Sequence, residues 1–63
     1  FKLLEILDLS YNLIETIPPE ISQLKGLQEL FLDNNRIREA PKEIGSLNLL
    51  MTLNLSDNMI RGF

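Results

Sequence analysis

The stretch "LDLSYNLIETIPPEI", residues 7–21, places the polar Asn12 among apolar residues that a buried core would be expected to contain. A related stretch, "LFLDNNRIREAPKEI", occupies residues 30–44, and "LNLSDNMIRGF" at residues 53–63 begins the pattern again. Each stretch starts 23 residues after the previous one, at positions 7, 30 and 53. Repetition at a constant interval is typical of proteins built from stacked units, so this repeat decides how the rest of the chain is interpreted.

Three Leu columns and one Asn column keep the same register in every unit. The aligned positions are Leu4, Leu27 and Leu50; Leu7, Leu30 and Leu53; Leu9, Leu32 and Leu55; and Asn12, Asn35 and Asn58. The units therefore run over residues 4–26 and 27–49, with a partial third unit at 50–63. Because no unit has the polar outer side that ends such a stack, we expect residues 1–63 to be an interior segment of a longer array.

Each unit is expected to begin with a short strand and to return through a short helical segment. The stretches "EILDL", "ELFLD" and "TLNLS" alternate apolar and polar residues, which is the period of a strand with one buried face. Farther along, Pro18-Pro19 or Pro41 precedes "EISQL" or "KEIGSL", where Ile and Leu three residues apart indicate a turn or two of helix or 3-10 helix. Stacked units would then form a parallel sheet on one side of the molecule.

The spacing L-x-x-L-x-L-x-x-N-x-L, with Ile in the last place, is present at residues 4–14, 27–37 and 50–60 and resembles the signature of the leucine-rich repeat family. The segments "IPPEISQLKGL" and "APKEIGSLNLL" resemble the 23-residue class of intracellular proteins such as Ras-pathway and cell-polarity scaffolds. The resemblance implies an α/β solenoid with a concave parallel sheet, convex helical or 3-10 segments and a cytoplasmic location. Ala40 departs from the pattern, which has Ile or Leu there, so its packing is in question.

The turn that follows Leu9 explains why Asn recurs. Chain reversal leaves backbone N–H and C=O groups pointing inward without a sheet partner, which is costly when these groups are buried. Asn offers both a donor and an acceptor. By resemblance, Asn12, Asn35 and Asn58 are expected to form a ladder of hydrogen bonds to the turns of their own and adjacent units. The alternative is that they are exposed turn residues, a setting that Asn also favours.

The composition argues against several classes of function. The chain has no Cys and no His, and 6 Lys and Arg stand against 9 Asp and Glu, for a net charge of −3. The commonest metal ligand and general base are therefore missing, and we expect no enzyme activity, metal or cofactor. The acidic balance argues against nucleic acid and against an anionic membrane. "SQLK" and "SDN" match motifs of penicillin-recognising enzymes, but Leu24 and Asn58 already have places in the repeat.

The outward strand positions are the candidate binding site, because the inward ones are needed for packing. The expected partner-binding residues of the concave face are Ile6, Asp8, Tyr11, Glu29, Phe31, Asp33, Asn54 and Asp57. Large apolar side chains surrounded by carboxylates are typical of a protein-binding surface and favour a basic protein partner. We therefore expect a protein–protein interaction module.

Several alternatives remain open at this point. Exposed apolar residues are normal on proteins, so the face can equally be solvated scaffold. The chain can also be a structural spacer between domains, or a targeting segment of a larger enzyme. Arg36, Arg38 and Arg61 form a basic edge that is interpreted either as solvated or as a contact for phosphate or an acidic partner.

Overall fold

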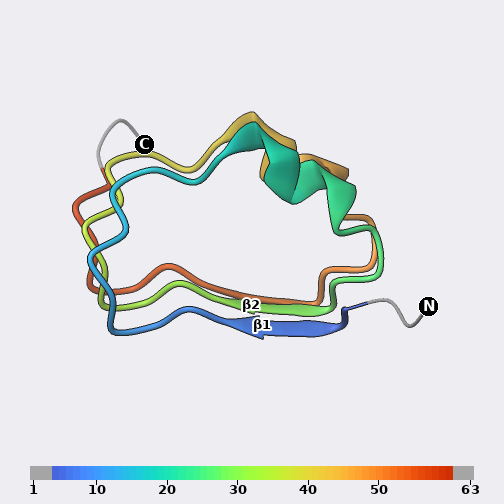
Figure 1. Ribbon diagram of the computed structural model, residues 1–63, viewed down its shortest axis with the longest axis horizontal. Helices are drawn as coiled ribbons and strands as arrows, with labels where there is room; N and C mark the ends of the chain where they lie inside the picture. The colour runs from blue at the N-terminus through green and yellow to red at the C-terminus, as the bar shows by residue number, and fades with distance from the viewer. Residues whose placement is uncertain (1–3, 61–63) are drawn as a thin grey trace.

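The computed structural model describes residues 4–60 as a stack of similar coils, with strands on one side and 3-10 helices on the other (Figure 1). The elements in chain order are β1 (Ile6–Asp8), η1 (Pro19–Gln23), β2 (Glu29–Phe31), η2 (Lys42–Ser46) and β3 (Thr52–Asn54). This arrangement confirms the predicted solenoid with a parallel sheet and short 3-10 segments. The last part of the third unit, including Arg61, lies outside the described residues.

The register of the sheet is the register of the sequence repeat. The three strands are parallel and lie in the order β1-β2-β3. Leu7 pairs with Leu30, and Leu30 pairs with Leu53, so every partner lies one repeat away. Side chains of one column therefore stack along the sheet, apolar ones toward the interior and the alternate ones toward the outside.

The core lies between the coils and is best covered in the middle one. Leu27, Leu30 and Ile37, all from the middle coil, are the largest fully buried side chains. The buried apolar residues as a whole are Ile17, Ile21, Leu27, Leu30, Leu32, Ile37 and Leu47. Positions equivalent to Leu30 in the outer coils are less covered: Leu7 is half-buried, and Leu53 is 40% exposed. Each coil thus depends on its neighbours to cover its Leu side chains.

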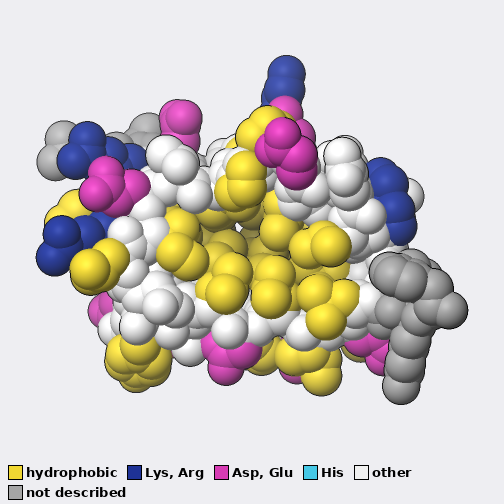
Figure 2. Space-filling model, viewed as in Figure 1, with side chains coloured by type: hydrophobic (Ala, Val, Ile, Leu, Met, Phe, Trp, Pro, Cys, Tyr) yellow, Lys and Arg dark blue, Asp and Glu magenta, His cyan; other side chains and the backbone are white. Residues whose placement is uncertain are grey.

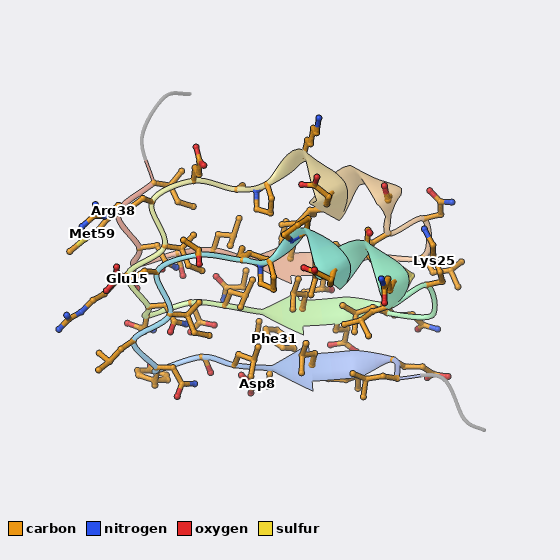
Figure 3. The ribbon with its side chains drawn as sticks, turned by 45° about the horizontal axis from the view of Figure 1, so that its top comes forward. Asp8, Glu15, Lys25, Phe31, Arg38 and Met59 are labelled. Atoms are coloured by element: carbon orange, nitrogen blue, oxygen red, sulfur yellow. The ribbon has the colours of Figure 1, made fainter. Side chains whose placement is uncertain are left out.

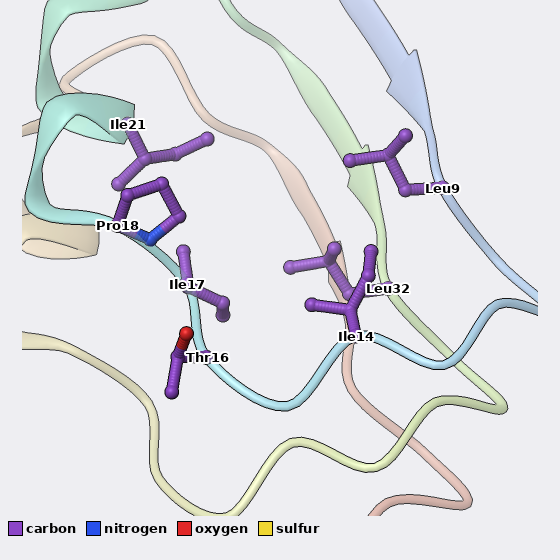
Figure 4. Close-up of a pocket in the computed structure, with 7 residues that line it drawn as sticks. All are labelled: Leu9, Ile14, Thr16, Ile17, Pro18, Ile21 and Leu32. Atoms are coloured by element: carbon purple, nitrogen blue, oxygen red, sulfur yellow. The ribbon is translucent and has the colours of Figure 1, made fainter.

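The end of the stack that carries β1 leaves apolar side chains open to solvent (Figure 2). A cavity of about 280 Å³ opens there, between the strand side and the helix side of the first coil (Figure 4). Its lining consists of Leu9, Ile14, Thr16, Ile17, Pro18, Ile21 and Leu32. Most of these residues belong to the core columns, so the cavity is an uncovered part of the core.

Proline sets the beginning of both 3-10 helices. Pro18 and Pro41 hold extended backbone conformations at the N-caps, with ψ near 149° and 148°. The helical hydrogen bonds then span three residues, as from the Ile21 N–H to the Pro18 carbonyl at 3.1 Å.

Ala40, one residue before Pro41, is exposed, whereas Ile17 at the same register is buried. Among residues 4–60, no helix is long and apolar enough to cross a membrane.

Replacing Leu30 should test the importance of the middle coil. Leu30→Ala is expected to lower the free energy of unfolding by about 2 to 5 kcal/mol, because it leaves a cavity in the best-covered part of the core. Leu53→Ala removes the same atoms at a site that is 40% exposed and should cost less. Urea unfolding followed by circular dichroism measures both changes. Equal losses would contradict a core centred on the middle coil.

Candidate functional site

Asn35 joins the first two coils through all of its side-chain hydrogen-bonding groups. Its Nδ2 donates to the carbonyls of Leu9 and Leu32, each at 3.0 Å, and to that of Asp33 at 3.2 Å. Its Oδ1 accepts the Ile14 N–H at 3.0 Å. The side chain is only 7% exposed, so these bonds satisfy backbone groups that water cannot reach easily.

Asn58 repeats this arrangement one coil later, and Asn12 does not. Asn58 bonds the Leu32 carbonyl at 2.9 Å and the Ile37 N–H at 2.9 Å, both in the preceding coil, in addition to its own turn. Asn12 donates only within its own turn, to Leu9 and Ser10 at 2.9 and 3.1 Å, and it is exposed. It therefore differs from the expected ladder member, because no described coil lies on that side to supply partners.

The residue before each of these Asn side chains adopts a left-handed backbone conformation. Tyr11, Asn34 and Asp57 have φ of 57°, 57° and 55°. Asn and Asp tolerate this region, but for Tyr it is strained. The stack holds the turn in place, since the Tyr11 N–H bonds the Asp33 carbonyl and the Asn34 N–H bonds the Ser56 carbonyl, each at 3.0 Å. The ladder and these turns keep the ends of the strands in a fixed position.

The outward strand residues form one surface, which we call the sheet face. It consists of Ile6, Asp8, Glu29, Phe31, Thr52 and Asn54. Phe31 lies at its centre, paired in the register with Asp8 on one side and Asn54 on the other (Figure 3). Phe31 is half-buried, and Ile6, which is 55% exposed, is its diagonal neighbour.

The other predicted site residues lie past the strand ends. Asp33 is half-buried and follows β2 by two residues, where its Oδ2 accepts a hydrogen bond from Asn34 Nδ2 at 3.1 Å. Tyr11 and Asp57 occupy the left-handed turns and are exposed. The predicted set is therefore split between the sheet face and the row of turns beside it.

Asp8 and Asn54, on either side of Phe31, are held in the same way by a Ser two residues later. Asp8 Oδ1 accepts the Ser10 hydroxyl at 2.6 Å and the Ser10 N–H at 3.1 Å. Asn54 Oδ1 accepts the Ser56 hydroxyl at 2.8 Å and the Ser56 N–H at 3.0 Å. Sequence reasoning missed this pairing, although the signal is visible as D-x-S and N-x-S at the same place in two units.

These hydrogen bonds also affect the charge of Asp8. The bond from the Ser10 hydroxyl, followed by the bond from the Ser10 N–H, lowers the pKa of the Asp8 carboxyl, and desolvation opposes them only in part. Both bonds use Oδ1, so Oδ2 of this exposed carboxylate is open to solvent or to a partner.

Positively charged residues are absent from the described strands, whereas acidic residues are present there and elsewhere. The charged residues of the strands, Asp8 and Glu29, are both acidic. The cations of the described part of the chain lie outside the strands. Lys25 lies in the loop after η1, Arg36 and Arg38 lie in the turn after Asn35, and Lys42 lies in η2. Figure 3 shows Lys25 and Arg38 toward opposite ends of the coils. Within residues 4–60, no three His, Cys, Asp or Glu side chains come together as a metal site.

Comparison with known proteins identifies the family of the repeated units. Residues 2–49, more than half of the chain, match the family model described as Leucine Rich repeats (2 copies). The matched segment covers the two complete units of the sequence pattern. A search of curated proteins finds no match for the chain.

Substitution of the Asn residues should distinguish an inter-coil bond from a local one. Asn35→Ala leaves the Ile14 N–H without its partner, at a cost of about 1 to 3 kcal/mol if the group stays dry. The carbonyls of Leu9 and Leu32 lose one donor each but keep their bonds from Asn12 and Asn58. Asn12→Ala should cost less, because both of its hydrogen bonds are exposed and the Leu9 carbonyl keeps its bond from Asn35. Urea unfolding and amide hydrogen exchange at Ile14 check this, and unchanged exchange in Asn35→Ala would contradict it.

Removing the Ser10 hydroxyl should change both the pKa of Asp8 and the response of stability to acid. Because folding lowers this pKa, the stabilisation is present above the ordinary pKa of Asp and is lost as pH falls through the folded value. Ser10→Ala should therefore raise the pKa of Asp8, as measured by carboxyl NMR titration, and its stability deficit should shrink in acid. Ser56→Ala is the matched control, since Asn54 does not titrate and the deficit should not depend on pH.

Proposed function

Because the chain belongs to the leucine-rich repeat family, whose repeats generally mediate protein–protein interaction, we propose that it binds a protein partner through the sheet face. The family is typically non-enzymatic, and the proposed role is non-catalytic. The observation that carries the proposal is the position of Phe31. This large aromatic side chain lies on the outer side of the central strand and is not part of the core.

Phe31 and Ile6 would supply most of the apolar contact. They lie diagonally on neighbouring strands, so one partner side chain can touch both. Full burial of a side chain of this size is worth about 1.5 to 3 kcal/mol. The strand ends are held by the Asn35 and Asn58 bonds between coils, so binding need not order the backbone, which lowers the entropic cost of association.

The charge of the face favours a basic partner. Asp8 and Glu29 lie on the strands, and Asp33 and Asp57 lie on the adjoining turns. A surface of one sign increases the rate of encounter with a partner of opposite sign and does so less at high salt. The 23-residue period and the Pro-containing return segments support a further proposal, that the chain belongs to the intracellular scaffold class of the family.

Alanine substitutions on the sheet face test the proposal. A random peptide library displayed on phage and selected against the chain supplies the probe, and isothermal calorimetry measures the Kd of the selected peptides. Phe31→Ala and Ile6→Ala should each weaken binding by about 3- to 10-fold, because only the part of each side chain that is exposed in the free chain can be newly buried. Leu13→Ala, an exposed apolar residue in the turn after Asn12, is the control and should leave the Kd unchanged.

The opposite pattern would refute a site on the sheet. If Phe31→Ala binds as well as the unaltered chain while Leu13→Ala does not, the partner contacts the turns. If the library yields no binder, the face is solvated scaffold.

A further inference from the structure

The two side chains that flank Phe31 share one hydrogen-bonding frame and differ in charge. Resting on the binding face proposed above, we propose that the β1 side of this face receives a single Lys or Arg side chain of the partner. The aliphatic stem lies over the Phe31 ring, and the cationic head meets Asp8. The β3 side receives a neutral polar group at Asn54, so the charge difference orients the partner across the strands.

The argument begins with the placement of the three side chains. Phe31 pairs with Asp8 in β1 and with Asn54 in β3, and neighbouring strands are about 4.8 Å apart. An aromatic ring is therefore bordered by a carboxylate on one side and by a carboxamide on the other. Asp8 and Asn54 each accept two hydrogen bonds from the Ser that follows two residues later, so neither side chain needs to be ordered on binding.

The unoccupied atoms of these side chains specify the ligand chemistry. At Asp8, both Ser10 bonds end on Oδ1, and Oδ2 is left as an accessible acceptor with negative charge. At Asn54, both Ser56 bonds end on Oδ1, and Nδ2 is left as a neutral donor. The first suits an ammonium or guanidinium N–H, and the second suits a carbonyl or hydroxyl oxygen. The Phe31 ring between them suits the methylene stem of a long basic side chain and attracts its cation.

The surrounding charges favour the same assignment. The described cations, from Lys25 to Lys42, lie outside the strands, so none of them belongs to the face that Asp8 occupies. Glu29 lies on the same face, next to Phe31 in β2, and adds to the negative potential beside the ring. The hydrogen bonds from Ser10 lower the pKa of Asp8 and so favour its charged form. At the level of Phe31, the cation therefore has a charged partner in β1 and an uncharged one in β3, whereas Asp57 lies beyond β3 on the adjoining turn.

The chain itself provides isosteric substitutions for the test. Asp8→Asn should keep the hydrogen bonds from Ser10, because Asn54 accepts the equivalent two bonds from Ser56. Asn54→Asp should keep those of Ser56, because Asp8 accepts both bonds as a carboxylate. Exchange of the Ser10 and Ser56 amide protons, followed by NMR, verifies that both turns remain in the full chain. Glu20→Gln on η1 is the control, since it removes the same charge from the opposite side of the coil.

The probe is the set of phage-selected peptides that bind the unaltered chain. We expect these peptides to share one basic residue, and Asp8→Asn to weaken their binding by about 3- to 5-fold, as for an exposed charge pair. Glu20→Gln should change the Kd by less than about two-fold, the scale of a distant, screened charge. Selection against the double exchange, Asp8→Asn with Asn54→Asp, should return peptides whose basic residue lies on the other side of the apolar residue.

The outcomes separate this inference from the proposed function. If peptides bind and require Phe31 but Asp8→Asn binds them equally well, or if Glu20→Gln weakens them as much, the basic side chain is not seated at Asp8 and the inference fails alone. The inference also fails alone if peptides selected against the double exchange keep the basic residue on the same side of the apolar residue. If no peptide is selected, or if binding does not require Phe31, the binding face and the inference fail together.

Discussion

The hydrogen bonds of Asn35 are the constraint on which the rest of the structure depends. A coil of 23 residues must reverse direction directly after a strand, and the reversal points peptide groups into an apolar interior. One carboxamide satisfies carbonyls in two coils and an N–H in the preceding one. The bond to Ile14 and the bond to Leu9 align neighbouring coils as well as closing a turn. The sheet register and the stacking of Leu side chains are consistent with this alignment.

The division of labour between the two faces of the strands follows from the same constraint. Inward positions carry Leu side chains that neighbouring coils cover, and outward positions carry charged and polar residues together with Phe31 and Ile6. With the strand ends held from inside, the outer side chains do not contribute to alignment and are available for recognition. Phe31 illustrates the difference from Leu30, its neighbour in β2, which is fully buried.

Much of the fold could be predicted from the sequence, because strand pairing and repetition share one interval. Leu7, Leu30 and Leu53 are aligned by counting residues, and the structure pairs them. The 3-10 segments could be predicted because Pro18 and Pro41 restrict the backbone before them. The strands are three residues long, shorter than the five-residue alternation indicates, although backbone hydrogen bonds between the coils continue past β1 at Leu9 and Tyr11.

Features that depend on neighbouring coils or on local side-chain geometry could not be predicted from the alignment of the repeats. Asn12 and Asn35 are the same residue at the same register, yet within residues 4–60 only Asn35 bonds a preceding coil. Tyr11 carries no sequence signal for a left-handed turn and adopts one because the stack supplies its hydrogen bond. Among the candidate site residues, the membership of the sheet face followed from strand alternation, whereas the fixing of Asp8 and Asn54 by Ser10 and Ser56 required side-chain geometry.

The short strands have a consequence for evolution. Each strand has two outward positions, and each of these has an equivalent at the same register in the neighbouring coils. A substitution there touches neither the Leu columns nor the Asn carboxamides, so natural variation can alter recognition in single steps without a penalty in foldability. Duplication of a coil would add two more variable positions, which allows specificity to diversify faster than the architecture that supports it.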